Sequence, residues 1–416
     1  MINVAILSAS REVTLIKHFR RIISENGGGK VFSLDIESNR PSMFFSDEAI
    51  ICPMLDSNEY ESFIFKFCID NKINLIFSCR DEDLVFLSKF KYKLKSIGTI
   101  AMVAEYGAIK ICNDKKLFNE FCMENDFNIP KVYESHTNIN YPVFLKPQMG
   151  KGSLNTFKVK NKKMLDFILD NFEEDFIIQK YIDKKEYTID LFSDFDGRVI
   201  SVVPRERVLT VGGESYIGKT FKNDLIINES VRLSECLGLI GHNTLQCFFD
   251  GVDVEWIEVN PRFGGGANLG FKSGHLTPEY LISLIKGESL ESKIGKFEDG
   301  LQMLRYTSDI FKSTNSKSIK NKIFCIDVDG TICTQNCKYE ESKPIYKCIE
   351  KINQLYDDGN EIILFTSRGY YSGVDWTDLL KQHFTDWGVK YHKLLQGKPY
   401  ADYYVDNKVI DVLDWI

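Results

Sequence analysis

The first hundred residues alternate short apolar runs with amphipathic segments. Apolar runs as long as buried strands occupy residues 4–7, 31–34, 49–52 and 75–78, and apolar residues recur at helical spacing over 13–24 and 59–71. This alternation is typical of an α/β unit with a parallel sheet. The turn after the first run, residues 8–11, lacks the glycine pattern of a dinucleotide-binding loop, so we expect no cofactor there.

The same patterns continue along the rest of the chain. They predict a helix from Asp114 to about residue 128, and strands over residues 141–147, 176–182, 199–203, 255–260, 323–326 and 361–365. The polar stretch 312–318 is typical of a linker. We therefore expect three domains, over residues 1–105, 106–310 and 322–416, with a linker over 311–321.

Composition narrows the classes of partner. The 416 residues suffice for about three domains of ordinary size, and 44% hydrophobic residues support real cores. A net charge of −7 argues against general affinity for nucleic acid or anionic membranes. The 11 cysteines lack the spacing of zinc or redox motifs, and no apolar run approaches the ~20 residues of a membrane span. Because the N-terminus predicts a strand rather than a signal peptide, we expect a cytoplasmic protein with no membrane or nucleic-acid partner.

Two carboxylates, Asp327 and Asp329, follow the strand predicted over residues 323–326. Side chains at i and i+2 of a strand point the same way, and two like charges are costly together unless a cation lies between them. The following Gly330-Thr331 would turn the chain and leave both carboxylates at the carboxyl edge of the sheet, where α/β folds hold ligands. Taken alone, the motif is equally compatible with an exposed acidic turn.

Further polar motifs follow this pair. Thr366-Ser367-Arg368-Gly369 follows the next predicted strand, Lys398 precedes Pro399, and Asp402 and Asp406 come last. In this order the last hundred residues resemble the haloacid dehalogenase superfamily, most closely its small phosphatases found with capsular-polysaccharide genes, through Tyr339, Pro344, residues 387–392 and 397–399. The spacing leaves no room for a cap domain, so we expect a capless Rossmann-like fold with an open site.

The resemblance implies a role for each of these residues. Asp327 would be the nucleophile that forms an aspartyl phosphate, Asp329 the general acid and base, and Thr366 and Lys398 would bind the phosphoryl group. Mg²⁺ would be held by Asp327, Asp329, Asp402 and Asp406. Many relatives have a second acid where this chain has Asn407, which leaves the division of labour between Asp402 and Asp406 open. A phosphorylated small molecule or glycan intermediate is the expected substrate.

A second set of motifs lies in the middle of the chain. Lys146 ends an apolar strand, where a buried lysine requires an anionic partner, and Gly150 and Gly152 lie in a turn that can place backbone N–H groups over phosphates. Glu258 and Asn260 are oxygen ligands at alternate strand positions, and Arg262 follows as a group suited to polyphosphate. Taken alone, the lysine and the turn favour an ordinary strand end with a hairpin turn.

Together these motifs make residues 1–290 resemble the ATP-grasp superfamily, especially carbamoyl-phosphate-synthetase-like and carboxylate–amine ligase members. The resemblance implies a pre-ATP-grasp α/β domain, an ATP-grasp domain and the cofactors ATP and Mg²⁺, for which Mn²⁺ is an expected substitute. The implied ATP contacts are Lys115, Lys146, Gly150, Gly152, Ser153, Gln179, Lys180, Tyr181, Ile182 and Glu186. The implied metal ligands are Gln246, Glu258 and Asn260, and Arg262 would stabilise the transferring phosphoryl group. Glutamine at 246, where many relatives have an acid, favours the synthetase-like branch.

Members of that superfamily typically transfer the γ-phosphoryl group of ATP to a carboxylate, and an amine then attacks the acyl phosphate. Arg205, Arg207 and Asn268 are candidates for holding the substrate, although both arginines are equally compatible with the surface. We expect a bifunctional enzyme, an amide-forming ligase fused to a phosphatase, acting on small carboxylates and amines, with a homodimer as the expected assembly. Two alternatives stay open: a small-molecule kinase, or one module that only binds.

Overall fold

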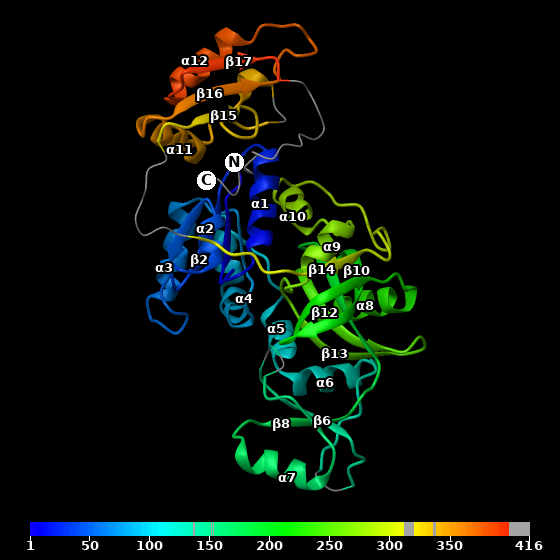
Figure 1. Cartoon of the computed structure of the whole chain (residues 1–416). Coiled ribbons are helices and arrows are strands. Elements are labelled where there is room, and N and C mark those ends of the chain that lie inside the picture. The colour runs from blue at the N-terminus through cyan, green and yellow to red at the C-terminus, as the bar shows by residue number, and fades with distance from the viewer. Residues whose placement is uncertain (136–137, 151, 153, 312–319, 336–337, 399–416) are drawn as a thin grey trace.

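The computed structural model describes residues 1–135, 138–150, 152, 154–311, 320–335 and 338–398. Within these residues four sheets form one elongated arrangement (Figure 1). The C-terminal sheet lies at one end and a small antiparallel sheet at the other, with a five-stranded and a six-stranded sheet between them. No helix in these ranges is long and apolar enough to cross a membrane.

The N-terminal sheet has the strand order β3-β2-β1-β4-β5 and is parallel throughout. This confirms the α/β unit expected from the alternation of strands and helices. Its elements are β1 (Val4–Leu7), α1 (Val13–Glu25), β2 (Val31–Asp35), α2 (Pro41–Phe45), β3 (Glu48–Ile51), α3 (Tyr60–Asp70), β4 (Leu75–Ser78), α4 (Asp81–Ser96) and β5 (Ile100–Ala101).

The six-stranded sheet has the order β13-β12-β9-β10-β11-β14 and is antiparallel. Its elements and flanking helices are β9 (Lys185–Ser193), β10 (Val199–Val211), β11 (Glu214–Thr220), α8 (Asp224–Leu237), β12 (Gly241–Phe249), β13 (Val254–Asn260), α9 (Ala267–Ser273), α10 (Thr277–Ile285) and β14 (Gln302–Leu304). The strand predicted over 199–203 is therefore much longer, because β10 continues into a hairpin with β11.

A small antiparallel sheet, β7-β6-β8, packs against one helix. Its elements are β6 (Val143–Pro147), β7 (Phe157–Val159), α7 (Lys162–Asn171) and β8 (Phe176–Lys180), and two helices precede it, α5 (Tyr106–Asn113) and α6 (Lys115–Glu124). The helix expected to extend to residue 128 ends at Glu124. The Asp114 carboxylate caps α6 by accepting bonds from the backbone N–H groups of Lys116 and Leu117.

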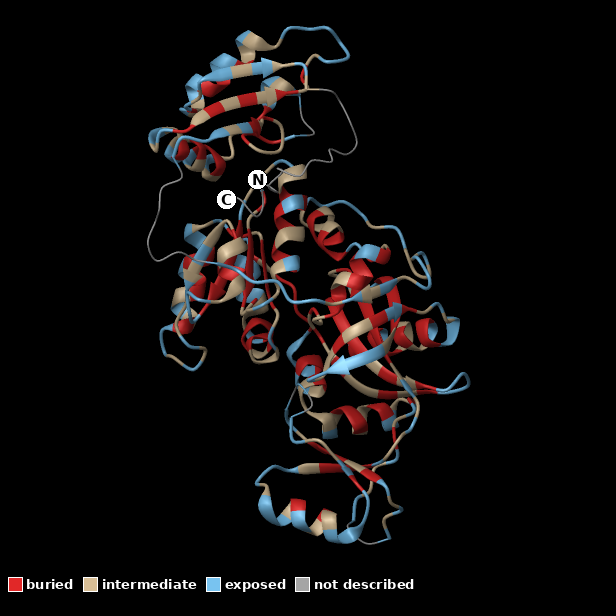
Figure 2. Cartoon of the chain, viewed as in Figure 1, coloured by how far each residue is buried: buried red, intermediate tan, exposed pale blue. Residues whose placement is uncertain are grey.

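The N-terminal and six-stranded sheets share a hydrophobic core through α1. Val4 and Ile6 of β1 face α1, and the same cluster includes Phe271 of α9 and Tyr280 of α10. Ala5 and Leu7 face the opposite side, toward α3 and α4. A strand covered on both faces is mostly apolar, which is why β1 is an unbroken apolar run and β4 is apolar up to its last residue, Ser78. Both strands are entirely buried in the fold (Figure 2).

The C-terminal sheet is parallel, with the order β15-β16-β17. Its elements are β15 (Ile323–Asp327), the short 3₁₀ helix η1 (Tyr339–Glu341), α11 (Tyr346–Asp357), β16 (Glu361–Thr366), α12 (Thr377–Trp387) and β17 (Lys393–Gln396). It has its own hydrophobic core, built from the strands, α11 and α12. The Lys347 ammonium of α11 donates a 2.9 Å hydrogen bond to the Ser46 carbonyl, so this unit contacts the N-terminal one.

Candidate active sites

A cavity of about 780 Å³ opens over the six-stranded sheet. Its walls come from segments that are distant in sequence: the loop before α1 with Glu12, the end of β4 with Cys79, the small sheet with Lys146, and the segment 260–266 after β13. Of the residues expected to bind ligands, the lining includes Lys115, Lys146, Gly150, Gly152, Glu186, Arg205, Arg207, Gln246, Glu258, Asn260 and Arg262. Folding therefore gathers eleven expected residues around one space.

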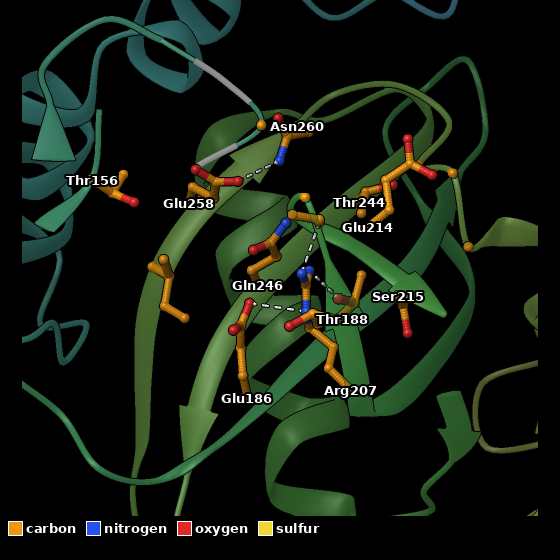
Figure 3. A pocket seen from close by; sticks show the side chains of 18 of the residues that line it. Thr156, Glu186, Thr188, Arg207, Glu214, Ser215, Thr244, Gln246, Glu258 and Asn260 are labelled. Atoms are coloured by element: carbon orange, nitrogen blue, oxygen red, sulfur yellow. Dashed lines mark hydrogen bonds and ion pairs between the residues drawn. The ribbon is translucent and has the colours of Figure 1, made fainter. Parts of the chain in front are cut away.

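Oxygen side chains suited to a hard cation lie on two neighbouring strands of the cavity floor (Figure 3). Glu258 and Asn260 are alternate residues of β13, and the Asn260 Nδ2 donates a 3.0 Å bond to the Glu258 Oε1. Their side chains thus point the same way, as the strand period predicts. Gln246 of β12 stands directly opposite Glu258 in the antiparallel register. A carboxylate and two amide oxygens are donors that fit Mg²⁺.

Two lysines enter the cavity from other elements. Lys146 is buried at the end of β6, and its Nζ donates to the Ile257 carbonyl at 3.3 Å. Burial, opposed in part by Glu258, lowers the pKa of Lys146 to about 8. Within the described residues its hydrogen bond thus goes to a neutral carbonyl, and Glu258 is the carboxylate that favours its charged form. Lys115, the first residue of α6, donates from Nζ to the Gly150 carbonyl at 2.6 Å.

Each of the three expected arginines is held by an acid. The Arg262 Nε and Nη2 contact the Asp81 carboxylate at 2.6 and 2.8 Å, a bidentate pair with the first residue of α4. Arg205 pairs with the fully buried Asp190 of β9, at 2.7 Å from its Nε and 2.8 Å from its Nη2.

The third arginine, Arg207, pairs through its Nε with Glu186 at 3.2 Å (Figure 3). Its Nη2 donates to the Gly213 carbonyl at 2.8 Å. The alternative that Arg205 and Arg207 are surface residues is wrong, since the side chain of Arg205 is 2% exposed and that of Arg207 is 9% exposed. Glu186, expected as an ATP contact, is paired with this arginine.

Other expected residues lie apart from this cavity. Gln179 is buried on β8 opposite Phe144, Lys180 is exposed at the end of that strand, and neither they nor Tyr181, Ile182 and Asn268 are among the lining residues. Ser153 lies outside the described residues. Asp81 and Asp190, the acids that orient two of the arginines, were not expected from the sequence. Asp81 follows the carboxyl end of β4, a position where α/β folds commonly hold ligands, and this is the signal by which the sequence could have indicated it.

A second polar cluster lies at the carboxyl edge of the C-terminal sheet. The Lys398 ammonium contacts the Asp327 Oδ2 at 2.6 Å, and the Thr366 hydroxyl lies 3.5 Å from the Asp329 Oδ2. Asp327 ends β15 and Thr366 ends the neighbouring β16, so parallel pairing brings them together. Asp402 and Asp406 lie outside the described residues.

The main partner of Asp329 was not expected from the sequence. Arg368 is buried, and its Nη2 and Nε donate to the Asp329 carboxylate at 2.6 and 3.0 Å. Each of the two carboxylates therefore has a cationic side chain beside it. Within the described residues, no cluster of three or more Asp, Glu, His or Cys side chains could hold a metal ion.

Comparison with known proteins agrees with the geometry of the larger cavity. Residues 4–103 match the family described as PylC-like, N-terminal domain, and residues 112–266 match the ATP-grasp domain family. The chain is 25% identical over 287 residues to the carbamoyl phosphate synthase large chain of Clostridium acetobutylicum, covering 62% of this chain and 26% of that protein. It therefore spans about a quarter of that relative's length.

Another relative is similar over nearly its whole length. The D-alanine–D-alanine ligase of Clostridium botulinum is 26% identical over 306 residues, which cover 62% of this chain and 96% of the ligase. Among solved structures, the biotin carboxylase domain of the Hydrogenobacter thermophilus 2-oxoglutarate carboxylase superposes with a TM-score of 0.58 at 17% identity, covering 72% of this chain and 73% of that one, a likeness of fold. The chain thus contains an ATP-grasp domain preceded by a PylC-like N-terminal domain.

Proposed function

We propose that the N-terminal and ATP-grasp domains form a ligase that uses ATP to join a small carboxylate to an amine. The observation that carries the proposal is the convergence of Lys115, Lys146, Glu258, Asn260 and Arg262 on one cavity within the ATP-grasp match. The similarity to a D-alanine–D-alanine ligase supports it. We propose residues 106–310 as the bounds of the domain.

The side chains suggest a division of work. Lys115 and Lys146 supply positive charge for the phosphates, and Arg262 supplies a planar donor fork held in place by Asp81. Mg²⁺, held by Gln246, Glu258 and Asn260, would neutralise phosphate charge during transfer. The γ-phosphoryl group would move to the substrate carboxylate, and the amine nitrogen would then attack the acyl carbon and release phosphate. Arg205, with its guanidinium fixed by Asp190, is a candidate anchor for the carboxylate.

Mass spectrometry can test the proposal on pools of candidate substrates. The protein is incubated with ATP, Mg²⁺ and pools of amino acids and sugar acids, and products are searched for new amides formed together with ADP and phosphate. A stable phosphorylated product that needs no amine would instead identify a small-molecule kinase. ATP binding with no turnover in any pool would identify a binding module, and either result would overturn the ligase proposal.

A second function is favoured at the C-terminal sheet. We propose that residues 322–416 hydrolyse a phosphate monoester, on the support of the 2.6 Å contact between Lys398 and Asp327 and the approach of Thr366 to Asp329 at 3.5 Å. Asp327 would act as nucleophile, with a lysine beside it to offset the charge of the bound phosphoryl group. We propose that Asp327, Asp402 and Asp406 would be ligands of Mg²⁺.

Release of p-nitrophenol from p-nitrophenyl phosphate in the presence of Mg²⁺ tests this second activity directly. Hydrolysis that is lost on removal of the metal and lost in Asp327→Asn supports it. Hydrolysis that persists in Asp327→Asn, or that is absent from the wild-type chain, contradicts it. The two activities could also act in one biosynthetic sequence, with a phosphorylated small molecule or glycan intermediate as the shared compound. This requires that one compound be a substrate or product in both assays.

A further inference from the structure

The Asp329 carboxylate is held from one side by a single buried arginine. Arg368 follows β16 by two residues, is 1% exposed, and reaches both oxygens of Asp329: Nη2 donates to Oδ1 at 2.6 Å and Nε to Oδ2 at 3.0 Å. A bidentate arginine–carboxylate pair fixes direction as well as distance. Its backbone N–H also donates to the Thr366 hydroxyl at 3.1 Å, which ties the arginine to the polar cluster at the sheet edge.

The arginine itself is fixed from several directions. Its guanidinium lies over the Tyr339 ring at 4.3 Å from the centroid, and its Nη2 lies 3.3 Å from the Ser342 hydroxyl and 3.4 Å from the Cys333 sulfur. These neighbours come from the segment between β15 and α11, which covers the arginine. Burying a guanidinium costs free energy unless its donors are satisfied. The Arg368 Nη1 has no hydrogen-bond partner among the described residues, so this cost is only partly offset, which indicates that the direction of the pair with Asp329 matters.

The neighbouring Asp327 has a different partner, Lys398. The two carboxylates are two residues apart, and each has a different cationic partner. Asp327 lies beside a lysine, and Asp329 is held by an arginine. Resting on the phosphatase activity proposed above, we infer that Arg368 is a positioning residue that orients Asp329 for proton transfer. It acts through Asp329 and does not itself contact the phosphoryl group.

The reaction has two chemical steps, and a misplaced Asp329 should affect them differently. First, an Asp327 oxygen attacks phosphorus, the bond from phosphorus to the leaving oxygen breaks, and Asp329 gives that oxygen its proton. Next, Asp329 takes a proton from water, the water oxygen attacks phosphorus, and the bond to Asp327 breaks to release inorganic phosphate. p-Nitrophenolate leaves without protonation, so a misplaced Asp329 slows mainly the second step and the aspartyl phosphate accumulates.

Rapid-mixing kinetics with p-nitrophenyl phosphate and Mg²⁺ test this on the full chain. Arg368→Lys keeps a positive charge but loses the bidentate fork, and should lower steady-state turnover about 100-fold. It should retain an initial burst of about one p-nitrophenol per chain, as should Asp329→Asn. Lys390→Ala, which removes an exposed ion pair with Asp357 in the same unit, is the matched control and should keep wild-type turnover.

Three results would overturn the inference. Wild-type turnover in Arg368→Lys would show that Asp329 needs no orientation, and loss of the burst together with turnover would show that Arg368 binds the phosphoryl group or merely supports the fold. If Arg368→Lys does not fold, Ser342→Ala provides the test, because it removes one contact of the guanidinium. This variant should lower turnover severalfold and keep the burst. Unchanged turnover in it would contradict the proposal. A wild-type chain without hydrolysis, or an active Asp327→Asn, would remove the phosphatase activity itself.

Discussion

The ATP-grasp cavity and the edge of the C-terminal sheet each place two oxygen side chains two residues apart at the end of a strand, yet they are assembled differently. In the cavity, Glu258 and Asn260 face residues drawn from the small sheet, α6 and the loop before α1. At the sheet edge, Asp327 and Thr366 end the parallel strands β15 and β16, and Lys398 follows β17, all within about 70 residues. The first site depends on how separate units pack, whereas the second follows from the local order of strands.

The sites also differ in how their arginines are used. In the cavity Arg262, Arg205 and Arg207 are each paired with an acid from another element, and Asp81 reaches Arg262 from the N-terminal domain. At the sheet edge Arg368 holds an acid that is itself part of the proposed chemistry. In the cavity, carboxylates orient the arginines proposed to bind the ligand. At the sheet edge, an arginine orients the carboxylate proposed to transfer a proton. The same arginine–carboxylate contact therefore has the opposite role in the two sites.

The largest expected effect separates the two sites outright. Asp327→Asn should lower hydrolysis of p-nitrophenyl phosphate by at least about 1000-fold, because the amide oxygen is a poor nucleophile. ATP consumption by the same protein should be unchanged, as measured by coupled ADP release. Loss of both activities would show that the two sites are not independent.

The reciprocal change affects the cavity. Glu258→Gln removes the charge of the proposed metal ligand on β13 and should lower Mg²⁺-dependent ATP turnover about 100-fold. Hydrolysis of p-nitrophenyl phosphate should stay at the wild-type rate, which serves as the internal control for folding. Undiminished ATP turnover would exclude Glu258 as a metal ligand.

A smaller effect is expected from the contact between domains. Asp81→Asn keeps the shape of the side chain but weakens both bonds to Arg262, and should lower ATP turnover about tenfold with little change in the KM for ATP. Glu82→Gln, a neighbour on α4 that pairs with Arg80, is the matched control. A large rise in KM would mean that Arg262 contributes mainly to ground-state binding.

The smallest effect is a dependence on pH. Burial, opposed in part by Glu258, lowers the pKa of Lys146 to about 8, so its ammonium is charged below pH 8 and neutral above it. Affinity for MgATP, measured by calorimetry, should be full below pH 8 and fall by up to about tenfold over the next pH unit. Lys146→Arg, charged throughout, should show a flat profile. A similar decline in that variant would assign the titration to another group.

Much of the framework followed from local patterns. Short, mostly apolar runs predicted β1, β2, β3 and β4. The sheet is covered on both faces at β1, β2 and β4, which are buried throughout, whereas the edge strand β3 alternates between partly buried and exposed positions. The alternate spacing of Glu258 and Asn260 predicted a shared direction, which the bond between them confirms. The apolar runs and the shared side-chain direction are properties of single strands. They could be predicted because a strand is formed by residues that are adjacent in sequence.

The partners of the charged groups could not be predicted in the same way. The sequence alone left Arg205 equally compatible with the surface, and packing buried it against Asp190. The hydrogen bond from Lys146 to the Ile257 carbonyl was not expected from the sequence either. The contact between Asp81 and Arg262 joins residues 181 positions apart. Such contacts depend on how one sheet packs against another through α1. The periodicity of the sequence reports only local structure, so it cannot predict which distant charged residue will lie beside a given side chain.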